Sequence, residues 1–444
     1  MGLGLLGRGV GDARYLAECG AELIVTDLKT REQLASSLAE LSHFSDIRFV
    51  LGEHRLEDFR DRDLILKAAG VPLDSPFVAE AKKNNIPVRM SADLFAEISG
   101  IPIVGVTGTR GKSTVTHMVY AILKEAGKPA PTPKVGAPTG SVGVVLGGNV
   151  RGVSTLALLS EVTPEHCAVL ELDSWQCHGF GEANISPHIA VFVTFFSDHL
   201  NYYGSTSLTT GHNALEVYLA DKANIFLNQK SEDTLVLGKQ CAPIIIEKYG
   251  EEIESRIIVV DELKLPDTWV LRIPGIHNRY NAALALAVAR TLNIDDSVSH
   301  SVLESFTGVP GRLELVAEKN GVKIYNDTTA TTPEATLAAL SALDPAHTVL
   351  IMGGADKNLD MSVLLAKLSE VKKVILLAGT GTNRVLEFLP GASVFDDFSK
   401  AVSEAFSSTE PGDVLLFSPA FASFGMFKNE YDRGDQFNAL VQSL

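Results

Sequence analysis

The segment at residues 103–116, IVGVTGTRGKSTVT, constrains the fold more than any other part of the chain. A β-branched apolar run leads directly into a glycine-containing loop, and Lys-Ser-Thr then opens a helical pattern. Such a loop holds nucleotide phosphates, because backbone N–H groups and a helix N-terminus face the anion, a lysine adds positive charge and a serine reaches Mg²⁺. The sequence therefore predicts a strand–loop–helix unit that binds ATP. The residues expected to contact ATP here are Gly108, Thr109, Arg110, Gly111, Lys112, Ser113 and Thr114.

The loop departs from the strict phosphate-loop spacing at one position. The first glycine would fall on Val106, whereas Gly105 stands one residue earlier. An ordinary glycine turn between a strand and a helix is the alternative interpretation. The direct succession of strand and Gly-Lys-Ser-Thr favours a variant phosphate loop.

Composition excludes several classes of function. The 444 residues are 45% hydrophobic, which is enough for two to four domains with separate cores. A formal net charge of −16 argues against a general nucleic-acid or anionic-membrane surface, since either needs clustered Lys and Arg. No apolar run approaches the roughly 20 residues of a membrane span, and four scattered cysteines fit a reducing cytosol. We expect a cytoplasmic protein, a monomer, that neither binds nucleic acid nor inserts into a membrane.

Apolar strand-like runs alternate with helical patterns almost throughout, which predicts an α/β protein with mainly parallel sheets. Three domains are expected, at residues 1–90, 91–308 and 309–444, with a hinge in the Gly-Val-Pro-Gly run at 308–311. The first and third should be Rossmann-like sheets, and the second a phosphate-loop ATPase domain. Ligands of such sheets collect at the carboxyl ends of the strands.

The first block opens with Gly2-x-Gly4-x-x-Gly7, and Asp27 stands 20 residues after Gly7. This arrangement is typical of a nucleotide-binding turn, in which the acidic residue meets a ribose hydroxyl. No strand precedes the glycines, because the sequence begins at Met1, so the sheet is expected to lack its first strand or the start codon to be misassigned. A plain glycine turn is the alternative.

Strand ends near the phosphate loop carry candidate metal ligands. Glu171 ends one buried strand, and Asp198 and His199 follow another, so together with Ser113 they can converge on Mg²⁺. The alternative for Glu171 is a cap or turn residue. Lys222 lies in a helical stretch, where the residue pattern alone predicts a solvated lysine on an amphipathic face.

Further candidates lie downstream. Asn278 and Asn281 fall on one face at the start of a helix, where their amides can bond an adenine edge, although capping by Asn278 is the alternative. Arg312 follows the hinge, where its guanidinium can reach phosphates when the domains close, or can form a surface ion pair. Asp327, at a strand tip, suits a ribose or a helix N-cap.

Lys357 and Ser423 likewise follow strands of the third block, where a ligand crevice is expected. Each is a weak signal alone.

Nine motifs together carry a family resemblance. They are GVTGTRGKST, VLELDSWQ, FSDHL, YLADKANIF, GIHNRYN, GVPGRLE, NDTTAT, MGGADK and SPAFASFGMFKN, in that order. Their order and spacing resemble those of the Mur ligases over nearly the whole chain. Within the family, the chain most resembles the members that join D-glutamate to UDP-N-acetylmuramoyl-L-alanine.

The resemblance implies a three-domain, ATP-dependent amide ligase of cytoplasmic peptidoglycan precursor synthesis. In this family ATP phosphorylates the terminal carboxylate of the UDP-linked donor, the amine of the amino acid attacks the acyl phosphate, and phosphate leaves. Two Mg²⁺ ions offset the repulsion between ATP and the carboxylate. The first block is implied to bind the UDP end of the donor.

Roles are carried over to matching positions. The resemblance implies that Lys112 and Ser113 hold phosphates and Mg²⁺, that Glu171 and His199 are metal ligands, and that Lys222 is carbamylated by CO₂ and helps hold the second ion. The last role reverses the interpretation of Lys222 from residue pattern. Residues implied to hold ATP are Asn278, Asn281, Arg312 and Asp327. Residues implied to bind the donor or D-glutamate are Gly4, Leu5, Leu6, Asp27, Asn149, Thr331, Lys357 and Ser423.

Four positions depart from the family pattern. Arg110 replaces the usual Asn of the phosphate loop, and Asp173 stands where many members carry Ser. Thr329 replaces a Lys, and Glu430 replaces an aromatic residue. The last three bear on the acceptor pocket and the UDP-sugar side, so they affect specificity more than ligase chemistry.

Three other functions are weighed against this one. A related Mur or folylpolyglutamate-type ligase would add a different amino acid, although Lys357 and Ser423 favour an acidic one. A dinucleotide-dependent oxidoreductase would leave Lys112, Glu171 and Lys222 unexplained. A non-catalytic Mur-like binding protein would bind substrates without consuming ATP.

Overall fold

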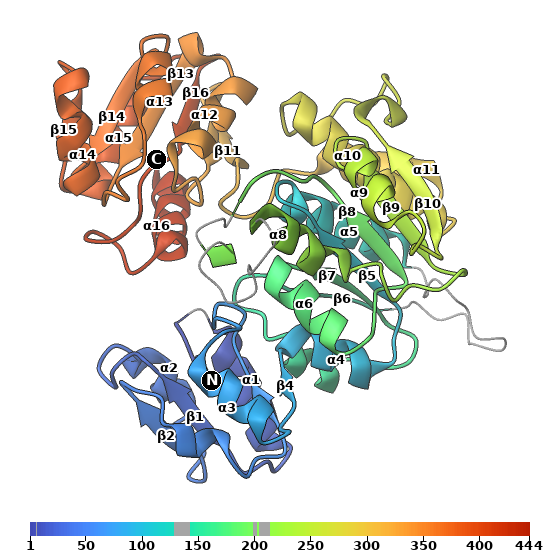
Figure 1. The fold of residues 1–444 in the computed structure, drawn as a ribbon. Helices are drawn as coiled ribbons and strands as arrows, with labels where there is room; N and C mark the ends of the chain where they lie inside the picture. The colour runs from blue at the N-terminus through green and yellow to red at the C-terminus, as the bar shows by residue number, and fades with distance from the viewer. Residues whose placement is uncertain (6, 128–142, 199–201, 204–213) are drawn as a thin grey trace. The chain divides into compact units, whose positions relative to one another are not determined.

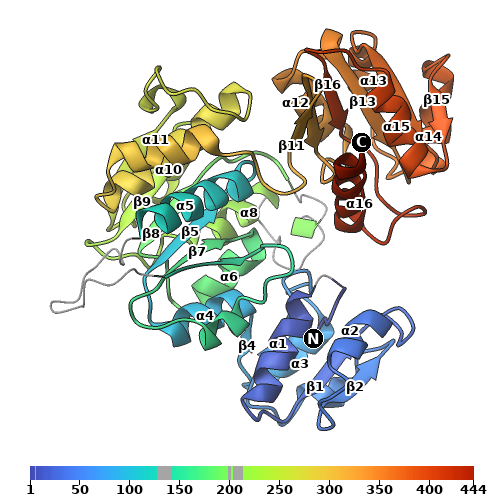
Figure 2. The ribbon, with the colours of Figure 1, turned by 180° about the vertical axis from the view of Figure 1, so that it is seen from behind.

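The computed structural model describes residues 1–5, 7–127, 143–198, 202–203 and 214–444. By its internal contacts the chain divides into a first unit, Met1–Asp267 with Tyr280–Val302, and a second unit, Thr268–Arg279 with Leu303–Leu444. This division does not separate residues 1–90 from the residues that follow, so the predicted boundary near residue 90 stays a prediction. Figure 1 shows the ribbon and Figure 2 shows it from behind.

The N-terminal part of the first unit holds two short parallel sheets, β1–β2 and β3–β4. Met1 and Gly2 connect them, because the Met1 amine donates to Leu66 O in β3 and Gly2 N donates to Thr26 O in β1. Residues 1 and 2 therefore lie between β1 and β3 without being assigned as a strand, and the expectation that the sheet lacks its first strand stays a prediction. The elements are α1 (Arg8–Glu18), β1 (Ile24–Asp27), α2 (Ala35–Glu40), β2 (Arg48–Leu51), β3 (Ile65–Leu66), α3 (Pro76–Lys83) and β4 (Val88–Arg89).

The rest of the first unit is built on a six-stranded parallel sheet in the order β10-β9-β8-β5-β7-β6. The strands are β5 (Ile103–Thr107), β6 (Val144–Gly148), β7 (Cys167–Glu171), β8 (Ile189–Phe192), β9 (Thr234–Gly238) and β10 (Arg256–Val260). The helices are α4 (Ser91–Ser99), α5 (Lys112–Ala126), α6 (Ser174–Glu182), α8 (Ala214–Ala223), α9 (Ala242–Tyr249), and the greater part of α10 (Ile276–Thr291) and α11 (Asp296–Ser305), whose residues 276–279 and 303–305 count with the second unit.

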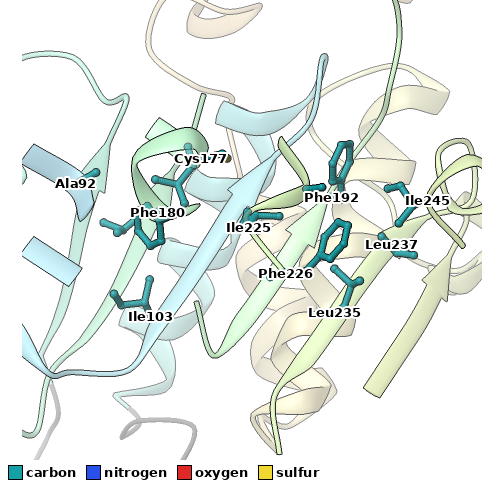
Figure 3. Packing of buried hydrophobic residues seen from close by; sticks show 14 of the residues in the cluster. Ala92, Ile103, Cys177, Phe180, Phe192, Ile225, Phe226, Leu235, Leu237 and Ile245 are labelled. Carbon is teal, nitrogen blue, oxygen red and sulfur yellow. The ribbon is translucent and has the colours of Figure 1, made fainter. Parts of the chain in front are cut away.

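Apolar side chains on one face of this sheet pack with α4, α6 and α8 into a large core, part of which is shown in Figure 3. Helix α5 covers β5, β6 and β7. Strand β5 lies between β7 and β8, and all of its residues are buried, as the β-branched run predicts. The carboxyl ends of these three strands therefore meet at one edge, since Val106 pairs with Glu171 and Thr107 with Phe192.

The second unit contains a six-stranded sheet in the order β11-β12-β16-β13-β14-β15, in which only β11 runs antiparallel to its neighbour. Helices α15 and α16 cover one face, and α12, α13 and α14 cover the other. The elements are β11 (Glu314–Lys319), β12 (Val322–Asn326), α12 (Pro333–Ala342), β13 (Thr348–Gly353), α13 (Ser362–Leu368), β14 (Lys373–Leu377), α14 (Thr380–Val385), β15 (Ser393–Phe395), α15 (Phe398–Ser407), β16 (Val414–Phe417) and α16 (Glu430–Ser443).

Among the described residues, no helix is both long enough and apolar enough to cross a membrane.

Candidate active site

The loop at residues 108–111 joins β5 to α5 and has a backbone that requires glycine at both ends. Gly111 has a φ of 84°, and a Cβ there would lie 2.6 Å from Asn281 Oδ1. Gly108 has a φ of 141°, and a Cβ there would lie 2.9 Å from Thr194 N. Both positions therefore exclude a side chain. The amides that open α5 start at this loop, in the arrangement that favours bound phosphate.

Thr194, just beyond β8, fixes the loop through three hydrogen bonds. Its carbonyl accepts from Thr109 N at 2.7 Å, and its hydroxyl accepts from Arg110 N at 2.9 Å and donates to Arg110 O at 3.0 Å. Sequence reasoning missed Thr194. The only signal was a polar residue within the apolar run VFVTFF.

Within the loop, Lys112 Nζ donates to Thr109 O at 3.3 Å. Ser113 is buried in the first turn of α5, and Thr114 is half-buried. Arg110, which departs from the family pattern, has an exposed side chain, while its backbone N–H and carbonyl bond Thr194.

Lys222, near the end of α8, is 1% exposed, which contradicts the solvated lysine predicted from residue pattern. Its Nζ donates to Thr107 Oγ1 at 3.2 Å and lies 5.0 Å from the centre of the Tyr218 ring. Burial, and secondarily the charge of Lys112, lowers the pKa of Lys222 to about 7. The amine thus lies against the last residue of β5, directly before the phosphate loop.

Glu171 is buried at the carboxyl end of β7, beside Asn149. Asn149 N donates to Glu171 O at 2.7 Å, and Asn149 Nδ2 lies 3.5 Å from Glu171 Oε1. Arg8, at the start of α1, donates to Asn149 Oδ1 at 2.6 Å. Arg8 therefore orients the amide so that its nitrogen faces the carboxylate. Sequence reasoning missed this arginine, whose partner lies 141 positions away.

Two predicted site residues, Leu6 and His199, lie outside the described residues. In the part of the chain that the structure describes, no three His, Cys, Asp or Glu side chains gather as a metal centre would require. The predicted ligand set of Ser113, Glu171, His199 and Lys222 accordingly stays a prediction. A hydroxyl and a carboxylate oxygen are donors that suit Mg²⁺.

Asn281 and Asn278 are both buried at the start of α10. Asn281 Oδ1 is the atom nearest to a Cβ built on Gly111, so this side chain borders the phosphate loop. Asn278 Nδ2 donates to Pro274 O at 2.6 Å, whereas a helix cap would accept from a backbone N–H, so this bond does not correspond to the capping role weighed for Asn278.

Asp173, another departure from the family pattern, is the N-cap of α6. Its carboxylate accepts from Gln176 N at 2.8 Å, while Gln176 Oε1 accepts from Asp173 N at 3.1 Å. This reciprocal pair is a capping box, which stabilises the helix start.

In the N-terminal part, the Asp27 carboxylate binds the glycine turn itself. It accepts from Gly4 N at 2.9 Å and from Lys29 N at 2.8 Å. Leu5 is exposed beside Gly4. The carboxylate therefore shapes the turn, whatever else it binds.

In the second unit, Asp327 follows β12 and is 8% exposed. Its carboxylate accepts from Leu313 N at 3.0 Å and from Ser418 Oγ at 2.7 Å. Burial raises the pKa of Asp327 to about 7, although these two bonds and the charge of Arg312 oppose the shift. Arg312 itself is exposed.

Thr331 and Lys357 are brought together, since Lys357 Nζ donates to Thr331 Oγ1 at 2.8 Å. Ser423 is buried on the neighbouring loop, where Ala422 pairs with Ala355 through bonds of 2.9 and 3.1 Å. Burial lowers the pKa of Lys357, and the Glu430 carboxylate opposes that shift. The predicted acceptor residues therefore come from adjoining loops of one sheet edge.

Thr329, which also departs from the family pattern, connects the loop after β12 to the residue that precedes Arg312. Its N–H and its hydroxyl both donate to Gly311 O, at 3.0 and 2.9 Å.

Comparison with known proteins agrees with this architecture. Residues 106–260 match the family description "Mur ligase middle domain", and residues 311–421 match "Mur ligase, glutamate ligase domain". Among solved structures, UDP-N-acetylmuramate-alanine ligase from Thermotoga maritima superposes with a TM-score of 0.57 at 19% identity, covering 100% of this chain and 98% of that one. MurF from Acinetobacter baumannii gives a TM-score of 0.58 at 17% identity, covering 88% and 93%. These structures share the fold.

Sequence relatives extend over the full length. The UDP-N-acetylmuramoylalanine–D-glutamate ligase of Roseiflexus sp. (strain RS-1) is 36% identical, covering 100% of this chain and 98% of the relative. Proteins of the same name from Borreliella burgdorferi (strain ZS7) and Geobacillus kaustophilus (strain HTA426) are 34% and 33% identical, each covering 100% of this chain and 97% of the relative. The chain therefore belongs to the Mur ligase family.

Proposed function

We propose that this chain is an ATP-dependent ligase that joins D-glutamate to UDP-N-acetylmuramoyl-L-alanine in peptidoglycan synthesis, with release of ADP and phosphate. The observation that carries the proposal is the phosphate loop with buried Lys222 against its supporting strand. It occurs in a chain that is similar over its full length to ligases of that name.

The chemistry explains why a phosphate loop is needed. A carboxylate is a poor electrophile, so its oxygen first takes the γ-phosphoryl group of ATP, and ADP leaves. The amine of D-glutamate then attacks the acyl carbon, an amide bond forms, and phosphate leaves as the amine loses a proton. The loop amides and Lys112 hold the phosphoryl oxygens during the first transfer.

The proposed Mg²⁺ ligands are Ser113, Glu171, His199 and Lys222 as its carbamate. When bound, two Mg²⁺ ions would neutralise phosphate charge and bring the anionic carboxylate within reach. Asn149, held by Arg8, would keep the Glu171 carboxylate in place.

Carbamylation joins the Lys222 amine to CO₂ with loss of a proton, which turns a cation into a carboxylate. The surroundings support this, because the side chain is 1% exposed and forms no ion pair with an Asp or Glu of the described residues. An ammonium buried in this way is costly, and a carbamate facing Mg²⁺ would relieve that cost.

The remaining roles are proposed by residue type and place. Asn278, Asn281, Arg312 and Asp327 would bind ATP. Gly4, Leu5, Leu6 and Asp27 would hold the UDP part of the donor, with Asn149 near its reacting end. The acceptor D-glutamate would bind Thr331, Lys357 and Ser423. We place residues 1–90, 91–308 and 309–444 in three domains of a cytoplasmic monomer.

Phosphate release tests the function. The protein is incubated with ATP, Mg²⁺ and UDP-N-acetylmuramoyl-L-alanine, against D-glutamate, L-glutamate and a panel of other amino acids. Release with D-glutamate alone is expected. Phosphate release with another amino acid would support the ligase chemistry but change the assigned acceptor. If no amino acid gave release, the proposal would be refuted.

A further inference from the structure

Arg433, in α16, has a fully buried guanidinium group. It lies at the edge of the six-stranded sheet of the second unit, where the proposed acceptor residues also lie. It is 0% exposed, and it forms no ion pair with a carboxylate of the described residues. Burial lowers its pKa to about 10, so it is still protonated at neutral pH. A charge this deeply buried needs a compensating set of hydrogen bonds.

Those bonds go to two different loops. Arg433 Nε donates to Thr328 Oγ1 at 3.1 Å, and Nη2 donates to Thr328 O at 2.7 Å. Arg433 Nη1 donates to Phe421 O at 3.2 Å, on the loop after β16. The guanidinium carbon lies 5.9 Å from the centre of the Phe417 ring. One planar group thereby holds the loop after β12 against the loop after β16.

Each loop leads directly to a proposed acceptor residue. Thr328 precedes Thr331 by three positions, and Phe421 precedes Ser423 by two. The intervening Ala422 pairs with Ala355, which leads to Lys357 on the loop after β13. Lys357 in turn donates to Thr331, which closes a ring of contacts around the three loops.

The first turn of α16 is seated closely on the same loop. Thr328 Oγ1 donates to Glu430 O at 2.7 Å, and Asn326 Nδ2 donates to Gly434 O at 3.1 Å. A Cβ at Gly434 would lie 2.6 Å from Thr328 Cγ2. The helix therefore cannot move relative to Thr328 without breaking several contacts at once.

We propose that Arg433 is a positioning residue for the acceptor amino acid: its guanidinium sets the spacing of the three loops that carry Thr331, Lys357 and Ser423. The proposal rests on the proposed function, because it takes these loops as the acceptor pocket. Only a planar fork with several donors can bond both loops, so lysine cannot replace it.

Steady-state kinetics test the role. Arg433→Lys keeps the charge and loses the fork, so the KM for D-glutamate should rise about 10- to 100-fold, the range that small misplacement of a binding group produces. The KM for the UDP-linked donor should change by less than about twofold, and the KM for ATP should change less than the KM for D-glutamate, because Asp327, which is proposed to bind ATP, lies next to Thr328. Equal changes in all three KM values, or wild-type kinetics, would overturn the proposal.

Lys372→Met is the matched control. Lys372 pairs with Asp413 at 2.5 Å, and these residues precede β14 and β16, at the amino ends of the same sheet. Loss of that pair should lower the melting temperature without raising the KM for D-glutamate. Should Arg433→Lys fail to fold, Thr328→Val removes the hydroxyl that accepts from Nε and should raise the same KM by a smaller factor.

A second readout does not depend on activity. Amide hydrogen exchange should accelerate at residues 327–331, 353–357 and 419–423 in Arg433→Lys and not in Lys372→Met. Unchanged exchange in these loops would overturn the positioning role even if the protein used a different acceptor. A failure of the proposed function itself would be seen in the wild-type protein. It would either release phosphate without preferring D-glutamate or release none.

Discussion

At the scale of single residues, Lys222 is buried directly beside the phosphate loop of the first unit, so its replacement should affect turnover strongly. Lys222→Ala should reduce turnover by at least about 100-fold, since it removes a proposed metal ligand. Acetate or formate should restore part of the activity by occupying the place of the carbamate. Phosphate release measures both effects.

Lys239→Ala is the control for Lys222, because Lys239 is exposed and pairs with Asp261 at 3.0 Å. It should leave turnover unchanged. With ¹³CO₂, the wild type should show a carbamate carbon signal by NMR that Lys222→Ala lacks. Full activity of Lys222→Ala would refute the carbamate role.

His178 links protonation to stability. Burial alone would lower the pKa of His178, but the carboxylates of Asp221, at 2.9 Å, and Glu182, at 3.6 Å, raise it to about 9. A folded-state pKa above the unfolded value of about 6.5 means that the stabilisation is complete below pH 6.5 and is lost as pH rises through 9. His178→Gln should therefore cost up to about 3 kcal/mol at pH 6 and much less at pH 10.

Urea unfolding between pH 6 and pH 10 measures this difference. A double-mutant cycle with Asp221→Asn should show a coupling free energy that fades over the same range. A coupling that is independent of pH would contradict the assignment.

Local sequence could predict residues whose role depends on their neighbours in the chain. Gly111 and Lys112 follow from the loop pattern, because backbone conformation and helix dipole are local properties. Arg8, Thr194 and Arg433 could not be predicted, because their partners lie 141, 84 and 105 positions away in the sequence. Residue pattern alone also predicted Lys222 as solvated, since helical periodicity cannot show which other element covers a helix face.

At the scale of elements, the segment after β8 is as important to the phosphate loop as β5 and α5. Thr194→Val removes two hydrogen bonds to Arg110, each worth about 1 kcal/mol. We expect the KM for ATP to rise at least about tenfold and the KM for D-glutamate to stay unchanged.

Thr348→Val is the matched control for Thr194, because it makes the same change at a buried threonine whose hydroxyl donates to Asp344 O at 2.7 Å in the second unit. It should not affect the KM for ATP. A Thr194→Val enzyme with wild-type ATP kinetics would show that the loop holds its shape without this support.

Alternation of strands and helices correctly predicted the parallel sheets, and β-branched runs located β5, β7 and β13. Strand ends were less predictable. The apolar run at 189–196 continues past β8, which ends at Phe192, because the following residues turn to hold the phosphate loop. Strand β11 was not expected, and it is the one strand that runs antiparallel in its sheet.

At the scale of the whole molecule, separate cores in the two units predict two unfolding transitions. Phe226 lies in the core of the first unit and Phe437 in that of the second, and both are at most 1% exposed. Phe226→Ala and Phe437→Ala should each cost about 3–5 kcal/mol. Differential scanning calorimetry should show each variant lowering a different transition, whereas one shared transition lowered by both would contradict this.

The seating of α16 on Thr328 has a consequence for how this sequence can evolve. Alanine at position 434 would collide with the Thr328 methyl group, but Thr328→Ser removes that methyl and keeps the hydroxyl that Arg433 and Glu430 use. Gly434→Ala should therefore be tolerated better after Thr328→Ser than before it. We expect the two positions to vary as a pair among descendants of this gene, in that order.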